Sequence, residues 1–196
     1  MQIKTEQGFV DVRELWTRFL QGDEEAYNCI MRSFARPLFN YGIRFSTDRD
    51  LVKDCIQDVF FDLWNKRSRI SETAYVQAYL LKSLRLRIHR ERKKWDPMES
   101  LETIPFAADF GIEMKMIEDQ SNLELRQRVK KVLNTLSERQ KEIVYLRFYQ
   151  SLSHDKISLV MGLTRQSAYN LLQKALIKMR KEWETAALVL FLIGLK

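Results

Sequence analysis

The chain has 196 residues, of which 45% are hydrophobic and 30% are charged. This balance excludes a disordered chain and allows one or two domains, each with a buried core. With only 6 glycines and 3 prolines, the chain lacks the tight turns that sheets need, so we expect an all-α fold. The net charge of +7 suits a partner such as nucleic acid or an anionic membrane, although a solvated surface explains the same value.

The charges are unevenly distributed along the chain. Residues 1–95 carry 18 basic and 13 acidic side chains, and residues 123–196 carry 14 basic and six acidic ones. Between them, residues 96–122 carry only one basic side chain and seven acidic ones. The middle segment also loses the periodic apolar pattern and contains two of the three prolines. We therefore predict two small helical domains at 1–95 and 123–196, joined by an acidic linker at 96–122.

Apolar residues recur at helical spacing from about residue 10, which predicts a first helix at 10–21. Gly22 is expected to end this helix, and Asp23 to cap the next. Pro37 is expected to kink that second helix or to restart it, because proline lacks an amide donor. A turn with a helix cap is predicted at 46–48.

The next helix is predicted at about 50–64, DLVKDCIQDVFFDLW, and it has two different faces. The apolar face holds Val52, Ile56, Val59, Phe60 and Leu63. The other face holds Asp54, Gln57, Asp58 and Phe61, spaced at i, i+3, i+4 and i+7. An exposed Phe among acids indicates a docking patch, unless a neighbouring helix covers it.

A further helix at about 73–94 combines basic and aromatic residues. Cations hold phosphates and aromatic rings stack on unpaired bases, so single-stranded nucleic acid is a plausible ligand. A basic surface helix with its aromatic residues in the core is the alternative.

The second half resumes with a predicted helix at about 122–136. Ser137 and Gln140 have the spacing of a capping box, which predicts a helix start there and an end near Tyr149. Ser153 is expected to cap a short helix that runs to Val160.

Residues 152–180 have the pattern of a helix-turn-helix. Gly162 suits the turn, where a positive φ is easiest for glycine, and Thr164 caps a second helix that runs to about 183. The predicted buried stripe of this helix is Ala168, Leu171, Leu172, Ala175 and Met179. Its outer face presents Arg165, Gln166, Tyr169, Asn170, Gln173 and Lys174. Arg, Gln and Asn match base edges in the major groove, which favours DNA over an ordinary helical hairpin.

Residues 133–181 resemble the C-terminal, −35-reading domain of bacterial RNA polymerase sigma factors. The likeness rests on LSERQ at 136–140, LRF at 146–148 and QKAL at 173–176. It implies −35 DNA contacts by Thr164, Arg165, Gln166, Ser167, Tyr169, Asn170, Gln173 and Lys174. Two-component response regulators carry similar blocks, so this half alone leaves the family open.

The first half also resembles sigma factors. Residues 50–64 resemble the helix that docks on the clamp of the polymerase β′ subunit, which implies polymerase contacts by Asp54, Gln57, Asp58, Phe61 and Trp64. Residues 75–95 resemble the helix that melts and reads the −10 element, although Leu86 and Tyr79 depart from the common Asn and Trp. That likeness implies −10 DNA contacts by Tyr75, Tyr79, Lys82, Arg85, Arg87, Arg90, Arg92 and Lys93.

The three matches occur in family order, and the chain is identified as a member of the extracytoplasmic-function (ECF) group of sigma factors. Membership implies binding to core RNA polymerase through its β′ clamp and β flap, promoter recognition and transcription initiation. Promoter DNA and an anti-sigma factor are the further partners that it implies. The alternative is a stand-alone helix-turn-helix regulator that binds DNA without polymerase.

No catalytic constellation is present. The two cysteines, Cys29 and Cys55, and the two histidines, His89 and His154, lie too far apart for a zinc motif. We expect the cysteines to be buried, the histidines to be polar surface residues, and the protein to lack enzyme activity, cofactors, metal and small-molecule substrates. The N-terminus has no signal segment, so the cytoplasm is the expected location.

The most apolar run of the chain is its tail, residues 186–195. A membrane-spanning helix needs about 20 apolar residues, so we predict a docking segment without membrane insertion. Packing within its own domain is preferred, and docking between the domains or on a partner remains open.

Overall fold

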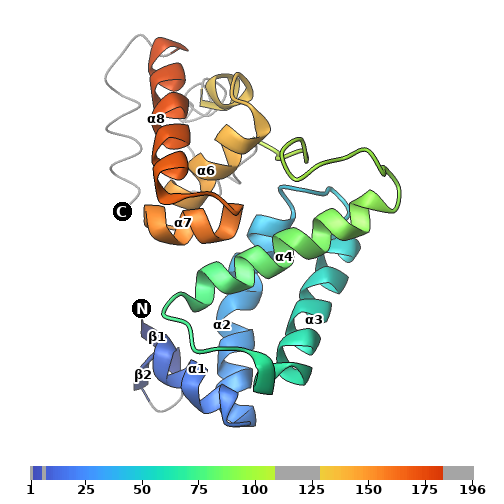
Figure 1. Ribbon diagram of the computed structural model, residues 1–196, viewed down its shortest axis with the longest axis vertical. Helices are drawn as coiled ribbons and strands as arrows, with labels where there is room; N and C mark the ends of the chain where they lie inside the picture. Colours follow the sequence, from blue (N-terminus) through green and yellow to red (C-terminus); the bar gives the residue numbers. More distant parts are fainter. Residues whose placement is uncertain (1, 6–7, 109–128, 183–196) are drawn as a thin grey trace, which may run out of the picture. The chain divides into compact units, whose positions relative to one another are not determined.

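The computed structural model describes residues 2–5, 8–108 and 129–182. Its internal contacts divide the chain into two units, Met1–Met98 and Glu99–Lys196 (Figure 1). The predicted tail at 186–195, the second half of the linker and the start of the predicted 122–136 helix lie outside the described residues. Apart from one short hairpin, the described elements are helical, as the sequence predicted.

The hairpin opens the first unit, and the sequence pattern did not predict it. Strand β1 (Gln2–Thr5) pairs antiparallel with β2 (Gly8–Asp11). Each strand has four residues, too few for a period-two pattern to stand out. Helix α1 (Val12–Leu20) follows directly, and the Arg13 amide donates to the Asp11 carboxylate at 3.1 Å.

The remaining elements of the first unit are α2 (Glu24–Gly42), α3 (Arg49–Asn65), the 3-10 turn η1 (Arg67–Arg69) and α4 (Val76–Lys93). Helix α2 packs against α1, α3 and α4, and α3 also packs against α4 (Figure 1). The largest fully buried side chains of this bundle are Trp16, Phe19, Phe34, Tyr41, Phe45, Leu15, Ile30, Leu38, Leu80, Leu81 and Leu84.

Helix α2 continues through Pro37, so no new helix begins there as the sequence analysis had allowed. Proline removes the amide donor that would have bonded to the Ser33 carbonyl. Phe34, Leu38 and Tyr41 are buried on either side of it. Their packing against the bundle outweighs the one lost hydrogen bond.

The second unit contains helical residues 129–134, α6 (Glu138–Phe148), α7 (His154–Met161) and α8 (Arg165–Glu182). The predicted capping box of Ser137 and Gln140 is present, and Ser153 accepts from the Lys156 amide. Gly162 has φ +65, which confirms the predicted left-handed turn between α7 and α8. Helix α8 packs against both α6 and α7.

Part of the segment predicted as a linker lies in the core of the second unit. Ile104 and Phe106 are buried, and the Phe106 ring meets the Tyr145 ring edge-on at 5.6 Å. The Phe106 amide also donates to the Glu138 carboxylate at the start of α6. Residues 99–108 therefore pack against α6, held by buried apolar side chains, by the hydrogen bond to Glu138 and by an ion pair between Glu102 and Arg139.

Among the described residues, no helix is both long and apolar enough to cross a bilayer.

Candidate nucleic-acid interface

The outer face of α3 is the first candidate surface. The helix begins at a cap in which Asp48 accepts from the Asp50 and Leu51 amides. Its predicted apolar face is buried, together with Cys55. Asp54, Gln57 and Asp58 are exposed, and Phe61 is 67% exposed. The described helices therefore leave Phe61 uncovered, as a docking patch requires.

Trp64, predicted as part of the same polymerase-docking set, lies differently. It is half-buried, with its ring 5.0 Å from the Tyr27 ring and 6.4 Å from the Phe19 ring. The Arg67 guanidinium lies 4.3 Å from the Trp64 ring centroid, a cation–π contact. Trp64 therefore anchors the end of α3 in an aromatic cluster, and only part of it is open to a partner.

The residues predicted to contact −10 DNA lie on α4 and just before it, and they differ in how far they are exposed. Lys82, Arg90 and Lys93 are exposed, whereas Tyr75, Tyr79, Arg87 and Arg92 are half-buried. Arg92 donates to the Phe45 carbonyl at 3.0 Å, and the Tyr79 ring packs edge-on against Trp16 at 5.5 Å.

Arg85 corrects the sequence prediction, because its side chain is only 3% exposed. Helical spacing places it next to Leu84 and one turn from Leu81 and Ile88, all of which are buried. A cation in this position would have to leave its buried surroundings before it reached a phosphate.

Arg87 connects two sets of residues that the sequence analysis assigned to different partners. One terminal nitrogen lies 2.9 Å from an Asp62 carboxylate oxygen, and the other lies 3.4 Å from Asp58. Its side chain is only 20% exposed. A predicted DNA-binding cation on α4 is thus paired with a predicted polymerase-binding acid on α3.

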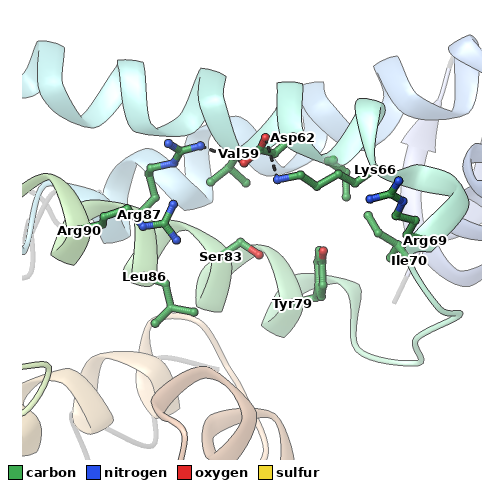
Figure 2. Close-up of a pocket in the computed structure, with 11 residues that line it drawn as sticks. Val59, Asp62, Lys66, Arg69, Ile70, Tyr79, Ser83, Leu86, Arg87 and Arg90 are labelled. Carbon is green, nitrogen blue, oxygen red and sulfur yellow. Dashed lines mark hydrogen bonds and ion pairs between the residues drawn. The ribbon is translucent and has the colours of Figure 1, made fainter.

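A pocket of about 320 Å³ opens between α3, η1 and α4 (Figure 2). Its walls carry four cations, one acid, two hydroxyl groups and four aliphatic side chains. The lining residues are Val59, Asp62, Leu63, Lys66, Arg69, Ile70, Tyr79, Ser83, Leu86, Arg87 and Arg90. The excess of cations suits an anionic ligand.

The electrostatics of this pocket centre on Asp62, which Figure 2 shows between Arg87 and Lys66. The hydrogen bond and charge of Lys66, 3.1 Å away, and the Arg87 guanidinium lower the pKa of Asp62, while burial opposes them. Burial raises the pKa of Tyr79, so its hydroxyl remains protonated at neutral pH.

Sequence reasoning assigned Tyr79, Arg87 and Arg90 to −10 DNA, and all three line this pocket, but it missed the contribution of the turn after α3. Lys66 lies just before η1 and Arg69 lies at its end, and the two residues bound a short basic run at 66–69. That run was the available signal, but nothing in it showed that the turn folds back beside α4.

The outer face of α8 is the second candidate surface. Seven of its eight predicted DNA-contacting residues are exposed, and Gln173 is half-buried. On the opposite face Ala168, Leu172, Ala175 and Met179 are buried, whereas Leu171 is only half-buried.

Two hydrogen bonds order the first turns of α8. Thr164 Oγ1 accepts from the Ser167 amide at 3.1 Å, which confirms the predicted cap. Gln166 Nε2 donates to Asn170 Oδ1 at 3.0 Å. The predicted base-reading side chains therefore stand together on one exposed and locally ordered surface.

Helix α7 reaches this surface with two residues that the sequence analysis did not assign to it. Asp155 Oδ1 lies 3.2 Å from Arg165 Nε. The His154 ring centroid lies 5.5 Å from that of Tyr169, and His154 is half-buried, not a simple surface residue.

In the part of the chain that the structure describes, no group of three His, Cys, Asp or Glu side chains has the arrangement of a metal site.

Comparison with known proteins gives the second unit a family and the whole chain a fold. Residues 126–179 match the family described as sigma-70, region 4. No curated protein matches the chain.

Two solved structures share its fold, each at 18% identity. One is CnrH in complex with the cytosolic domain of CnrY, with a TM-score of 0.58 over 87% of this chain and 96% of that one. The other is the sigma factor RpoE in complex with the anti-sigma factor NepR from Bartonella quintana, with a TM-score of 0.54 over 83% of this chain and 97% of that one. The second unit therefore carries a sigma-70 region 4 sequence, and the chain shares its fold, along most of its length, with CnrH and with the sigma factor RpoE.

Proposed function

We propose that this chain is a sigma factor of the extracytoplasmic-function type, which docks on core RNA polymerase through α3, opens the −10 element with α4 and reads the −35 element with α8. The observation that supports this assignment best is the two-faced character of α8. Arg165, Gln166 and Asn170 are exposed on one face, while the opposite face is buried against the rest of the helix-turn-helix. In helix-turn-helix proteins, a helix with an exposed face of this kind lies in the major groove, and the residues of its first turns contact the base edges.

Docking on the β′ clamp is assigned to Asp54, Gln57, Asp58 and Phe61. Phe61 supplies an apolar anchor of the kind that dominates protein interfaces, and the surrounding polar groups set orientation. Trp64 contributes only through its exposed part. Asp58 has a second role, because it also pairs with Arg87 inside the unit.

The pocket between α3, η1 and α4 supports the −10 assignment. Its cations suit phosphates, and Tyr79 offers a ring to an unpaired base. Tyr75, Lys82, Arg90, Arg92 and Lys93 extend the same surface along α4. Arg85 is not part of this contact set in the conformation described.

The domain division at 1–95, 96–122 and 123–196 is proposed to separate these tasks, with the second domain also meeting the β flap. We propose an anti-sigma factor as regulator, since RpoE is bound to one and CnrH is bound to the cytosolic domain of CnrY. A cytoplasmic protein without catalytic activity of its own is consistent with these assignments.

Reconstitution tests the proposal. Purified chain and core polymerase should co-elute, and the holoenzyme should initiate from a specific set of promoters in a genomic library. The R165A/Q166A variant should still bind core but shift or lose the −35 preference. Specific DNA binding in the absence of core, without co-elution, would instead identify a stand-alone regulator.

A further inference from the structure

The first turn of α7 lies against the first turn of α8, and the two turns meet through an ion pair. Asp155 Oδ1 is 3.2 Å from Arg165 Nε. The Arg165 side chain is 76% exposed and that of Asp155 is 44% exposed. The pair is therefore at the surface that faces outward from the helix-turn-helix, not in its core.

The geometry of this pair suits a base-reading arginine. Arginine binds guanine best when two nitrogens of its planar group meet two acceptors on the base edge. The ion pair with Asp155 involves Nε of Arg165, and the guanidinium carries further donors on Nη1 and Nη2 that a base edge can use. A held side chain loses less rotamer freedom when the base is bound.

A second contact from the same turn of α7 supports this interpretation. His154, adjacent to Asp155, packs its ring against Tyr169, which lies one helical turn after Arg165. Two consecutive residues of α7 thus support two outward side chains of α8. The hydrogen bond between Gln166 and Asn170 orders a further pair on the same face.

We infer that Asp155 is a positioning residue that sets specificity at the base read by Arg165. The inference rests on the proposed role of α8 at the −35 element. Its carboxylate also repels phosphates, so Asp155 lowers affinity for any DNA while it sharpens the choice of one base. This combination of effects distinguishes positioning from a structural role.

The test uses holoenzyme reconstituted with the full chain and a promoter library in which each −35 base pair is varied. R165A should reduce discrimination at one position by about 5- to 150-fold, the loss expected for a good base contact. D155N should reduce discrimination at that same position by about 3- to 10-fold, a fraction of the full contact. Its affinity for unrelated DNA should stay equal or rise.

Three comparisons isolate the effect. D155E should recover part of the discrimination, because it restores the carboxylate. In an R165A background, D155N should change the discrimination no further, since the two residues act as one unit. E182Q removes a negative charge at the far end of α8 and should leave base discrimination unchanged.

The outcomes separate this inference from the proposed function. Unchanged discrimination in D155N, with altered discrimination in R165A, would overturn the role of Asp155 alone. A uniform loss at all bases with a lower melting temperature would show a structural role and would overturn it as well. Unchanged preference in R165A alone would overturn this inference, whereas unchanged preference in R165A/Q166A would remove the reading role of α8 as well.

Discussion

Arg87 on α4 lies 2.9 Å from Asp62 on α3, and its other terminal nitrogen lies 3.4 Å from Asp58. The ion pairs join two helices that the sequence analysis had assigned to different partners. They also show that a charge reversal at Asp58 would place a second cation beside Arg87. A variant at that position therefore disturbs the fold as well as the docking surface.

The first prediction concerns the pH dependence of stability. Lys66 and Arg87 lower the pKa of Asp62 in the folded state. A carboxyl group with a lower pKa in the folded than in the unfolded state stabilises the protein at pH values above its unfolded pKa of about 3.9. This stabilisation is lost as the pH falls through the folded-state pKa. Because the Asp62 side chain is 39% exposed, D62N should cost no more than about 1 kcal/mol at pH 7.

Urea unfolding at pH 7 and at acid pH would measure this cost. The difference between wild type and D62N should shrink as the pH falls. D54N is the matched control, because Asp54 is exposed on the same helix and is not in these ion pairs. An equal cost at both pH values would contradict the assignment.

The second prediction concerns docking. Phe61 is 67% exposed, so F61A should change the free energy of unfolding by less than about 0.5 kcal/mol. Loss of an apolar anchor should weaken association with core polymerase by about 1–2 kcal/mol. I177A removes another exposed aliphatic side chain, on α8, and should leave core affinity unchanged. Titration of labelled chain with core measures both variants, and wild-type affinity in F61A would exclude this anchor.

The third prediction separates phosphate contacts from base contacts on α8. Lys174 is exposed on the outer face, and K174A should weaken all promoters alike and lower the salt slope of binding by about one. Q166A should instead cost roughly 1–3 kcal/mol of discrimination at a single base pair. Holoenzyme binding measured over a salt series gives both quantities. A loss of discrimination at one base pair in K174A would show that Lys174 contacts a base edge and not only phosphate.

The fourth prediction concerns the contact between α2 and α3. A Cβ at Gly42 would lie 2.6 Å from Val52 Cγ1 and 3.4 Å from both Ile88 Cδ1 and Leu84 Cδ2. G42A should therefore destabilise the protein by about 1–3 kcal/mol in urea unfolding, despite the better helix propensity of alanine. N40A, at an exposed position of the same helix, should be neutral or slightly stabilising. A gain in stability from G42A would show that the helices separate easily here.

The fifth prediction concerns thiol reactivity. Burial raises the pKa of Cys55 to about 11, so very little thiolate forms at pH 8. Cys29 is half-buried and should react first with an alkylating reagent in the folded protein. Cys55 should react only after denaturation, as peptide mass spectrometry would show. Equal labelling rates in the native state would mean that the α3 core opens readily.

The sequence by itself determined the local features of this protein. Asp23, Ser137 and Gly162 have the predicted roles as caps and turn, because such signals depend on hydrogen bonds within a few residues. The apolar faces of α3 and α8 followed from helical period, since period alone decides which side chains share a face. The all-α fold and the two candidate surfaces were therefore predictable.

The tertiary structure alone decided which predicted site residues are available and what each one contacts. Burial of Arg85, packing of Trp64 in an aromatic cluster and pairing of Arg87 with Asp62 all depend on neighbours from other elements. Asp62 and Arg87 are 25 residues apart, and Asp155 meets Arg165 only because the turn at Gly162 sets the angle between two helices. Helical period specifies the direction of a side chain around its own axis, whereas the packing of helices against one another determines what that side chain meets.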